Sequence, residues 1–287
     1  MGIRTVKAEA SWKTIVKYGV MCAIALLMLI PFLWMISTSL KSPDALLSMP
    51  PEFLPLAPRF SNYTDVFSRM PIGLFFFNSL KISVLGTIGE LMAASLAAYA
   101  FARMQFKGKN ILYGLFLATM MVPFQITMIP VFMIIKWLGW MDSQASLIIP
   151  HFFGGAFASA AFGIFLLRQF FESIPKELED ASRIDGAGRF RFLIKVILPL
   201  SKPALGVLGL FVFMGIWNDL LSPVLFLSSE DKMPLPFGLA TLQAAQHTNR
   251  YDLLMAGTLV SIIPIILFYI LVQRRVSDAF LRTGIKG

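Results

Sequence analysis

Apolar residues along this chain gather in six long segments, which shorter polar stretches separate. The segments cover residues 16–38, 74–102, 110–135, 145–167, 204–228 and 252–273. A helix needs about 20 mostly apolar residues to cross a bilayer, and each segment is long enough. Some contain prolines, which spanning helices tolerate when neighbouring groups satisfy the freed carbonyls. The pattern predicts an all-α, polytopic membrane protein with six transmembrane helices, forming one transmembrane domain over residues 1–287.

The composition supports a membrane protein and argues against nucleic acid as a partner. Hydrophobic residues make up 57% of the chain and charged residues 14%, whereas soluble domains are typically about half apolar and a quarter charged. The net charge of +9 comes without a basic cluster interleaved with aromatic residues, which nucleic-acid binding would require. The first apolar segment is also longer than the apolar core of a signal peptide. We therefore expect it to be retained as the first span.

Lysine and arginine are distributed unevenly among the polar stretches. The N-terminal stretch, residues 103–109, residues 168–202 and the stretch after Gln273 carry four, three, seven and four of them. The other loops together carry six. Because cytoplasmic loops are enriched in basic residues, we predict that both termini and the stretch 168–202 lie in the cytoplasm.

The cytoplasmic stretch 168–202 is much longer than a turn between two spans requires. Pro175 suits the first turn of a helix, the acidic residues after it suit the positive end of the helix dipole, and Gly186 suits a left-handed C-terminal cap. Small or apolar residues recur every three positions from Leu178 to Ile184. A helix lying on a membrane would need a wider apolar face and a basic polar face. We predict a short helix, from about Pro175 to Ile184, that fits a cleft in another protein.

The same stretch carries a motif. Glu179-Asp180-Ala181-Ser182 is followed by Asp185-Gly186-Ala187 and, with nine residues between it and Gly186, by Val196-Ile197-Leu198-Pro199. This spacing resembles the Glu-Ala-Ala (EAA) loop of binding-protein-dependent ABC importer permeases, with Asp180, Ser182 and Val196 in place of the usual residues. Further runs are similar to the carbohydrate-importer branch of that family, which includes the smaller maltose-transporter membrane subunit. They are Phe77-Asn78-Ser79-Leu80, residues 98–103, Trp217-Asn218-Asp219 and Gly284-Ile285-Lys286-Gly287.

The resemblance implies the membrane-spanning permease subunit of an ATP-driven sugar importer, multi-pass in a bacterial or archaeal cell (inner) membrane. Such a subunit forms half of the translocation pathway with a second homologous permease subunit. It binds two ATPase subunits and receives carbohydrate from an extracellular or periplasmic sugar-binding protein. ATP-driven closure of the ATPase subunits is coupled to alternating access.

The resemblance also assigns the chemistry to the partners. The chain itself would be no enzyme and would hold no cofactor or metal, with ATP and Mg in the partner ATPase. Consistent with this, the sequence has no Gly-x-x-x-x-Gly-Lys-Ser/Thr phosphate-binding loop. The residues implied in ATPase coupling, between spans four and five, are Glu177, Leu178, Glu179, Asp180, Ala181, Ser182, Arg183, Ile184, Asp185, Gly186 and Ala187.

Polar residues near or within the apolar segments are candidates for the translocation pathway. They are Asn78, Glu90, Trp217, Asn218 and Asp219. Glu90 lies in mid-segment, and ionisable residues inside membrane segments are usually functional. It suits three roles: lining the pathway, pairing with a partner subunit or carrying a proton. An ion-gradient-driven secondary transporter that uses Glu90 is therefore the alternative function.

Polar side chains also occur in the predicted external loop at residues 229–252. Gln243, Gln246, His247 and Asn249 are candidates for contact with the binding protein. Composition alone favours a solvated loop without a specific task. A membrane enzyme is a weaker alternative, because the sequence shows no constellation of nucleophile, base and metal ligands.

Overall fold

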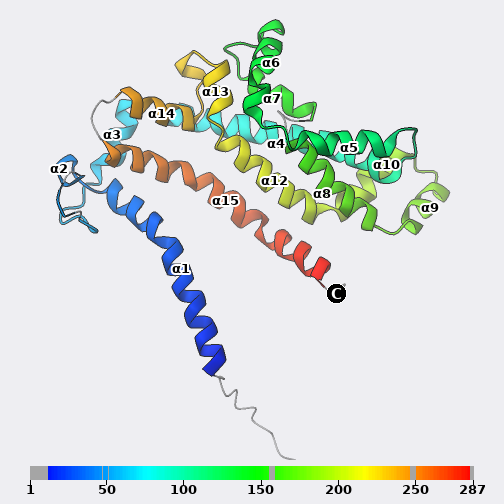
Figure 1. Ribbon diagram of the computed structural model, residues 1–287, viewed down its shortest axis with the longest axis horizontal. Helices are drawn as coiled ribbons and strands as arrows, with labels where there is room; N and C mark the ends of the chain where they lie inside the picture. The colour runs from blue at the N-terminus through cyan, green and yellow to red at the C-terminus, as the bar shows by residue number, and fades with distance from the viewer. Residues whose placement is uncertain (1–11, 47, 51, 155–158, 246–249, 285–287) are drawn as a thin grey trace, which may run out of the picture. The chain divides into compact units, whose positions relative to one another are not determined.

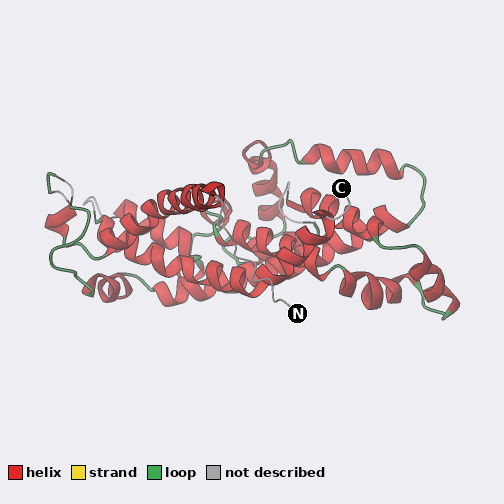
Figure 2. Cartoon of the chain, turned by 90° about the horizontal axis from the view of Figure 1, so that it is seen from below, coloured by secondary structure: helices red, strands yellow, loops and turns green. Residues whose placement is uncertain are grey.

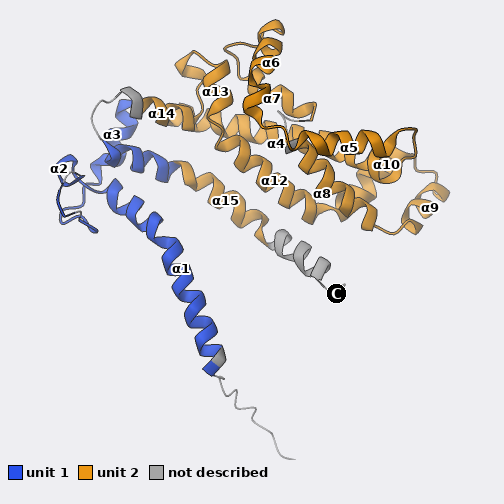
Figure 3. Cartoon of the chain, in the orientation of Figure 1, with its two compact units in different colours: residues 1–69, 246–260 blue, residues 70–245, 261–287 orange. Residues whose placement is uncertain are grey.

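A computed structural model describes residues 12–46, 48–50, 52–154, 159–245 and 250–284. Within these ranges the regular secondary structure is helical throughout (Figure 2), which confirms the all-α prediction. The chain divides into two compact units, which we describe separately (Figure 3). Unit 1 comprises residues 1–69 and 246–260, and unit 2 comprises residues 70–245 and 261–287. A single domain over the whole chain stays a prediction.

Unit 1 contains α1 (Trp12–Ser39), α2 (Pro43–Leu46), α3 (Ser61–Arg69) and the first residues of α15 (Tyr251–Gly284). Asn62 on α3 is fully buried, and its Nδ2 donates to the carbonyls of Ser39 at 2.9 Å and Lys41 at 2.8 Å. The amide thus satisfies carbonyls at the end of α1 and just beyond it, which a helix cannot satisfy itself. At the start of α15, Arg250 pairs with the buried carboxylate of Asp252 at 2.8 Å.

The remaining elements belong to unit 2 (Figures 1 and 3). They are α4 (Ile72–Arg103), α5 (Lys109–Thr119), α6 (Phe124–Trp137), α7 (Ala145–Phe152), α8 (Ser159–Ser173), α9 (Glu177–Ile184), α10 (Arg189–Phe192), the π-helix η1 (Leu193–Ile197), α11 (Leu198–Leu200), α12 (Lys202–Trp217), α13 (Leu221–Phe226), the 3₁₀ helix η2 (Glu230–Lys232) and α14 (Leu235–Ala245). The later part of α15 also belongs to this unit.

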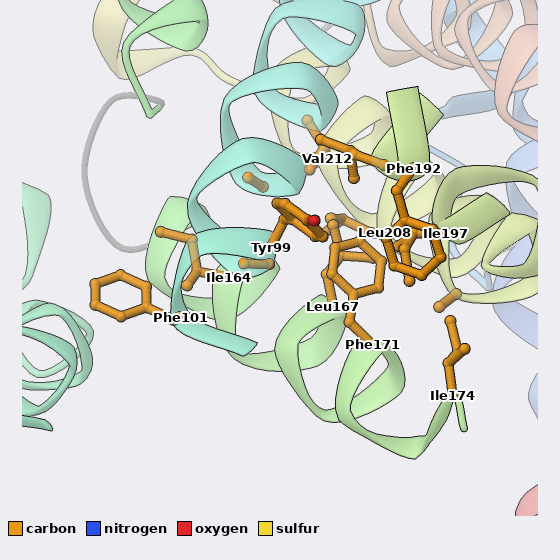
Figure 4. Packing of buried hydrophobic residues seen from close by; sticks show 14 residues of the cluster. Tyr99, Phe101, Ile164, Leu167, Phe171, Ile174, Phe192, Ile197, Leu208 and Val212 are labelled. Atoms are coloured by element: carbon orange, nitrogen blue, oxygen red, sulfur yellow. The ribbon is translucent and has the colours of Figure 1, made fainter. Parts of the chain in front are cut away.

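Helix α4 is the centre of unit 2. It runs along the unit and packs against α7, α8, α12 and α14 (Figure 1). Its C-terminal half contributes Tyr99 to a buried apolar cluster, which Leu167 of α8 and Leu208 of α12 complete from the other sides (Figure 4). Gly163 lies on α8, and a Cβ at this position would be only 3.1 Å from the side chain of Leu208. The glycine therefore lets α8 and α12 approach closely.

The structure supports between three and five membrane spans in the described part of the chain. Three helical stretches are long and apolar enough by themselves: Thr14–Ser39, Ile72–Arg103 and Tyr251–Gln273. Two bent helix pairs qualify if each counts as one span. In the first, α5 and α6 meet at 102°, and in the second, Arg189–Leu200 and α12 meet at 81°. Six spans therefore stay a prediction, and three of the predicted segments are not continuous helices.

Local signals explain these interruptions. Pro123 has no N–H with which to continue α5, and it precedes α6 with extended backbone. The fourth predicted segment breaks after α7, where Gly154 has a left-handed φ of 109°. The fifth breaks between α12 and α13, because Asn218 caps the end of α12 and Asp219 accepts the N–H of Ser222 at 3.2 Å.

Candidate functional site

The short helix predicted in the stretch 168–202 is present as α9, at one end of unit 2 beside α10 (Figure 1). It begins at Glu177 rather than at Pro175, and it ends at Ile184 as predicted. Gly186 has a φ of 74°. The N–H of Gly186 bonds to the carbonyl of Arg183, and the N–H of Ala187 bonds to that of Ser182. These two bonds form the Schellman motif, in which a left-handed glycine closes a helix.

The surface of α9 combines acidic and exposed apolar side chains. Glu177, Glu179 and Asp180 occupy its first turn. Leu178 is 41% exposed and Ile184 is 87% exposed, which means that these apolar groups are not used inside unit 2. A short polar helix with apolar side chains left uncovered suits a protein contact.

Arg103 is the last residue of α4, and its side chain contacts both α8 and α9. Its Nη2 donates to the carbonyl of Phe171 at 2.6 Å and to the carbonyl of Ile174, both next to the C-terminal end of α8. Its Nη1 lies 3.7 Å from Glu179 Oε2 on α9, and Arg183 binds the other oxygen of Glu179 at 2.8 Å. A guanidinium at a helix C-terminus satisfies orphan carbonyls and complements the dipole. Sequence reasoning counted Arg103 only as a loop charge and as part of a motif.

A cavity of about 700 Å³ lies inside unit 2, between α4, α6, α7, α12 and α13. Its wall is mostly apolar, with a few polar side chains, as is usual for small-molecule sites. Two of the predicted pathway residues, Glu90 and Asp219, line it. Glu90 lies on α4 and Asp219 lies between α12 and α13, so the fold brings together two candidates that are far apart in the sequence.

The other pathway candidates lie outside the cavity wall. Asn78 donates to the carbonyls of Asp231 at 2.8 Å and Met233 at 3.0 Å, and it thereby fixes the segment before α14. Trp217 is buried, and its Nε1 donates to the carbonyl of Ser261 at 3.1 Å. Asn218 caps α12. The contacts of these residues are structural within the chain.

Glu90 is fully buried and contacts a histidine that sequence reasoning did not single out. His151 Nδ1 on α7 lies 2.7 Å from Glu90 Oε2. Helix α7 can approach α4 this closely because Gly86 and Gly89 face it. A Cβ at Gly86 would lie 3.1 Å from the His151 ring, and one at Gly89 would lie 2.5 Å from the Phe152 ring. The available signal was that a buried carboxylate needs a partner.

Two residues that line the cavity each have a fully buried polar atom without a hydrogen-bond partner among the described residues. The two atoms are Glu90 Oε1 and Ser83 Oγ. Buried polar groups are nearly always paired, so each exception requires an explanation.

The candidates for binding-protein contact fall at the edge of what the structure describes. The backbone of Gln243 lies on α14, but its side chain is not described. Gln246, His247 and Asn249 lie outside the described residues. In another loop of unit 2, Asp142 accepts hydrogen bonds from the Ser229 hydroxyl and from the N–H groups of Ser228 and Ser229, and it pairs with Lys232 at 2.9 Å. These donors lower the pKa of Asp142 far below its ordinary value. The cluster joins the loop before α7 to the loop after α13.

Helices of spanning length, broken apolar helices and a mostly apolar cavity with a few polar side chains are features of a membrane transport subunit. Comparison with known proteins makes this specific. Residues 90–281 match the family described as binding-protein-dependent transport system inner membrane component. The chain belongs to this family, which confirms the resemblance seen in the sequence.

Individual relatives are permeases of transport systems. The chain is 32% identical to the diacetylchitobiose uptake system permease protein NgcG of Streptomyces coelicolor, over 89% of this chain and 83% of that protein. It is also 32% identical to the arabinooligosaccharides transport system permease protein AraQ of Bacillus subtilis, over 92% of both chains. A chain of a bacterial ABC transporter involved in import of the acidic polysaccharide alginate superposes with a TM-score of 0.76 at 28% identity, covering 93% of this chain and 97% of that one. None of these findings supports the ion-gradient alternative.

Proposed function

We propose that this chain is the permease subunit of an ATP-driven sugar importer in a bacterial or archaeal cell (inner) membrane. Two relatives are named as permeases of systems for diacetylchitobiose uptake and arabinooligosaccharide transport, which supports a sugar as the substrate. We infer six spans in a single domain over residues 1–287, with both termini and α9 in the cytoplasm, from the apolar segments and the bias of basic residues. The broken helices are compatible with this topology, because irregular backbone is tolerated at membrane depth where it is buried in protein or lines a cavity.

The observation that carries the proposal is the combination of exposed apolar side chains on α9 with its attachment to α4. We assign Glu177 to Ala187 to the contact with an ATPase subunit, in which ATP and Mg are bound. Two ATPase subunits would bind one such segment each, from this chain and from a second homologous permease. This chain holds no catalytic residue in the proposal.

The attachment supplies a route for mechanical coupling. When the ATPase subunits close on ATP, α9 moves with them, and Arg103 and Glu179 transfer the displacement to α4. Glu90 lies thirteen residues before Arg103 on the same helix, which is about 20 Å at 1.5 Å per residue. Displacement of α4 would therefore move the cavity wall and change which side of the membrane it faces.

The sugar reaches the pathway from an extracellular or periplasmic binding protein. The family description, which names dependence on a binding protein, supports this partner. We place its contact in the loop that contains Gln243, Gln246, His247 and Asn249. Asp142 and its partners would hold the base of the same external surface.

The proposal is tested by purifying this chain from membranes with the products of any genes expressed beside it. We expect an ATPase to co-purify, and we expect its hydrolysis to rise when binding protein and sugar are added to the reconstituted complex. Sugar uptake without an ATPase, driven by a proton or sodium gradient, would contradict the proposal.

A further inference from the structure

We propose that the segment Arg189–Leu200 binds the headgroup of an anionic phospholipid at the membrane surface. This segment comprises α10, η1 and α11. The inference rests on the proposed function, which places α12 across the membrane and the stretch 168–202 on the cytoplasmic side. It gives a ligand to a segment that lies outside the contact proposed for the ATPase.

The segment is almost perpendicular to the helix that follows it. Arg189–Leu200 and α12 meet at 81°. Pro203 lies in the first turn of α12, where a proline begins a new helix at no cost in hydrogen bonds. In one continuous helix its ring would clash with the carbonyl four residues earlier. A helix perpendicular to a membrane-crossing helix lies along the membrane surface, so the segment has the orientation of an interfacial helix.

One face of the segment is used inside unit 2. Phe192, Leu193 and Ile197 are buried. Phe192 and Ile197 lie beside Leu208 in the apolar cluster of this unit (Figure 4). This packing fixes the rotation of the segment about its own axis, so its opposite face is directed away from the cluster.

The opposite face carries apolar and basic side chains in two adjacent rows. Phe190 and Ile194 form an apolar row and are 66% and 46% exposed. Arg191 and Lys195 form a basic row and are exposed as well. Residues four positions apart are neighbours on the surface of a helix, and both rows have this spacing. An interfacial helix has this composition, because its apolar side chains enter the acyl boundary while its basic side chains stay at the headgroups.

The charge around the segment favours an anionic surface. Four basic side chains are exposed here, those of Arg189, Arg191, Lys195 and Lys202. None of the four forms an ion pair with another residue that the structure describes. The sequence also has no acidic residue between Gly186 and Asp219. A basic cluster immediately cytoplasmic of a spanning helix is typical of binding to anionic lipids.

Helix α9 has the opposite charge. It carries three acidic residues in its first turn and a single basic residue, Arg183. Only residues 185–188 separate it from α10, and the two helices lie at the same end of unit 2 (Figure 1). We therefore assign the acidic helix to the protein partner and the basic segment to lipid. A lipid bound at the segment would fix one end of the ATPase contact at the membrane surface.

The first experiment measures phosphatidylglycerol binding to the assembled transporter, with its permease partner and ATPase subunits, in detergent. Native mass spectrometry over a lipid titration counts the bound lipids and compares phosphatidylglycerol with phosphatidylcholine of the same acyl chains. We expect at least one phosphatidylglycerol to bind at least about tenfold more tightly than phosphatidylcholine. Arg191→Gln combined with Lys195→Gln should remove one tightly bound phosphatidylglycerol. This is a weakening of about tenfold or more, because each basic residue near an anionic surface contributes about fivefold.

Two control variants separate this site from charge in general. Lys107→Gln combined with Lys176→Gln removes two other exposed lysines, which lie before α5 and before α9. This control removes as much charge as the test variant and leaves the segment intact, so the number of tightly bound phosphatidylglycerols should equal that of the wild type. Arg191→Lys combined with Lys195→Arg keeps both charges and should also retain the lipid.

A second measurement identifies what covers the exposed face. Phe190→Cys, in a Cys22→Ser background that removes the single native cysteine, is labelled with an uncharged maleimide while the ATPase subunits are bound. We expect labelling to be severalfold slower in phosphatidylglycerol nanodiscs than in phosphatidylcholine nanodiscs. Lys107→Cys in the same background corrects for the effect of an anionic surface on thiol reactivity. A face covered by the ATPase would be labelled slowly in both nanodiscs, and a face open to solvent would be labelled quickly in both.

Three results would overturn the inference: equal numbers of bound phosphatidylglycerol in the test variant and the wild type, an equal loss in the lysine control, or labelling at position 190 that does not depend on the lipid. ATP hydrolysis stimulated by binding protein, measured on the same transporter, tests the proposed function separately. Stimulated hydrolysis without the lipid effect would overturn only the lipid site. Lipid binding at the segment without stimulated hydrolysis would overturn only the importer function.

Discussion

Replacing Arg103 by methionine removes the side chain that joins α4, α8 and α9. The guanidinium is buried, with only 4% of the side chain exposed. It donates to two backbone carbonyls, of Phe171 and Ile174, and lies 3.7 Å from the carboxylate of Glu179. Methionine retains an unbranched apolar stem, so the substitution mainly removes charge and hydrogen bonds.

The two carbonyl bonds should account for most of the lost stability. A hydrogen bond that involves a charged group contributes about 1.5–3 kcal/mol, so the two together contribute about 3–6 kcal/mol. The contact with Glu179 is longer, at 3.7 Å, and Glu179 keeps Arg183 as a closer partner at 2.8 Å, so we expect this contact to contribute less than either carbonyl bond, about 1 kcal/mol. We therefore expect Arg103→Met to lower the Tm of the purified transporter by roughly 10 °C, and Glu179→Gln by roughly 3 °C or less.

The assay is scanning fluorimetry of the assembled transporter, with ATP hydrolysis stimulated by binding protein as the measure of coupling. Arg168→Met is the matched control, because Arg168 makes a partly exposed pair with Glu172 at 2.9 Å and stacks over Tyr113. Such contacts contribute about 1 kcal/mol. Stimulated hydrolysis should fall in Arg103→Met and persist in Arg168→Met. Equal Tm losses in both variants, or a Glu179→Gln variant as unstable as Arg103→Met, would refute this reasoning.

Three further predictions follow from local geometry. Gly186→Val puts a β-branched residue at a φ of 74° and should destabilise the end of α9 by about 1–2 kcal/mol. We expect this variant to insert into the membrane but to lose stimulated ATP hydrolysis, whereas Gly186→Asn should retain most activity. Unchanged transport in the valine variant would contradict the coupling role. Asp142→Asn should speed proteolysis of the loop that contains it. Lowering the pH of the wild type from 7 to 5 should leave proteolysis unchanged, because a carboxylate with a lowered pKa keeps its stabilising effect until the pH falls below about 4. Gly238→Ala places a Cβ 2.2 Å from the buried ring of Phe75 and should destabilise by about 1–3 kcal/mol in thermal melts; Gly114→Ala, where the space is open, should be neutral or stabilising.

Local signals explain most of what could be predicted from the sequence. The glycine that ends α9 was predictable, because a left-handed cap depends on one residue and its immediate neighbours. The break between α12 and α13 was not, although Asp219 and Ser222 are only three residues apart. Apolar residues continue on both sides of them, so a window of spanning length averages over the cap. Hydropathy measures the solvent that a segment prefers, and it carries no information about where the backbone hydrogen bonds of the segment end.

Pairings between distant segments were beyond prediction for a different reason. A buried Glu90 requires a partner, but its chemistry admits any donor, and only the approach of α7 to α4 selects His151. The approach in turn depends on glycines whose role is invisible until the two helices are placed together. Arg103 illustrates the same point at the other end of α4. Helix α4 contains no proline and is continuous from Ile72 to Arg103, whereas the helices that complete the cavity are broken or bent. The proposed mechanism follows from that contrast, because only an unbroken helix transmits a displacement at its end to a cavity wall about 20 Å away.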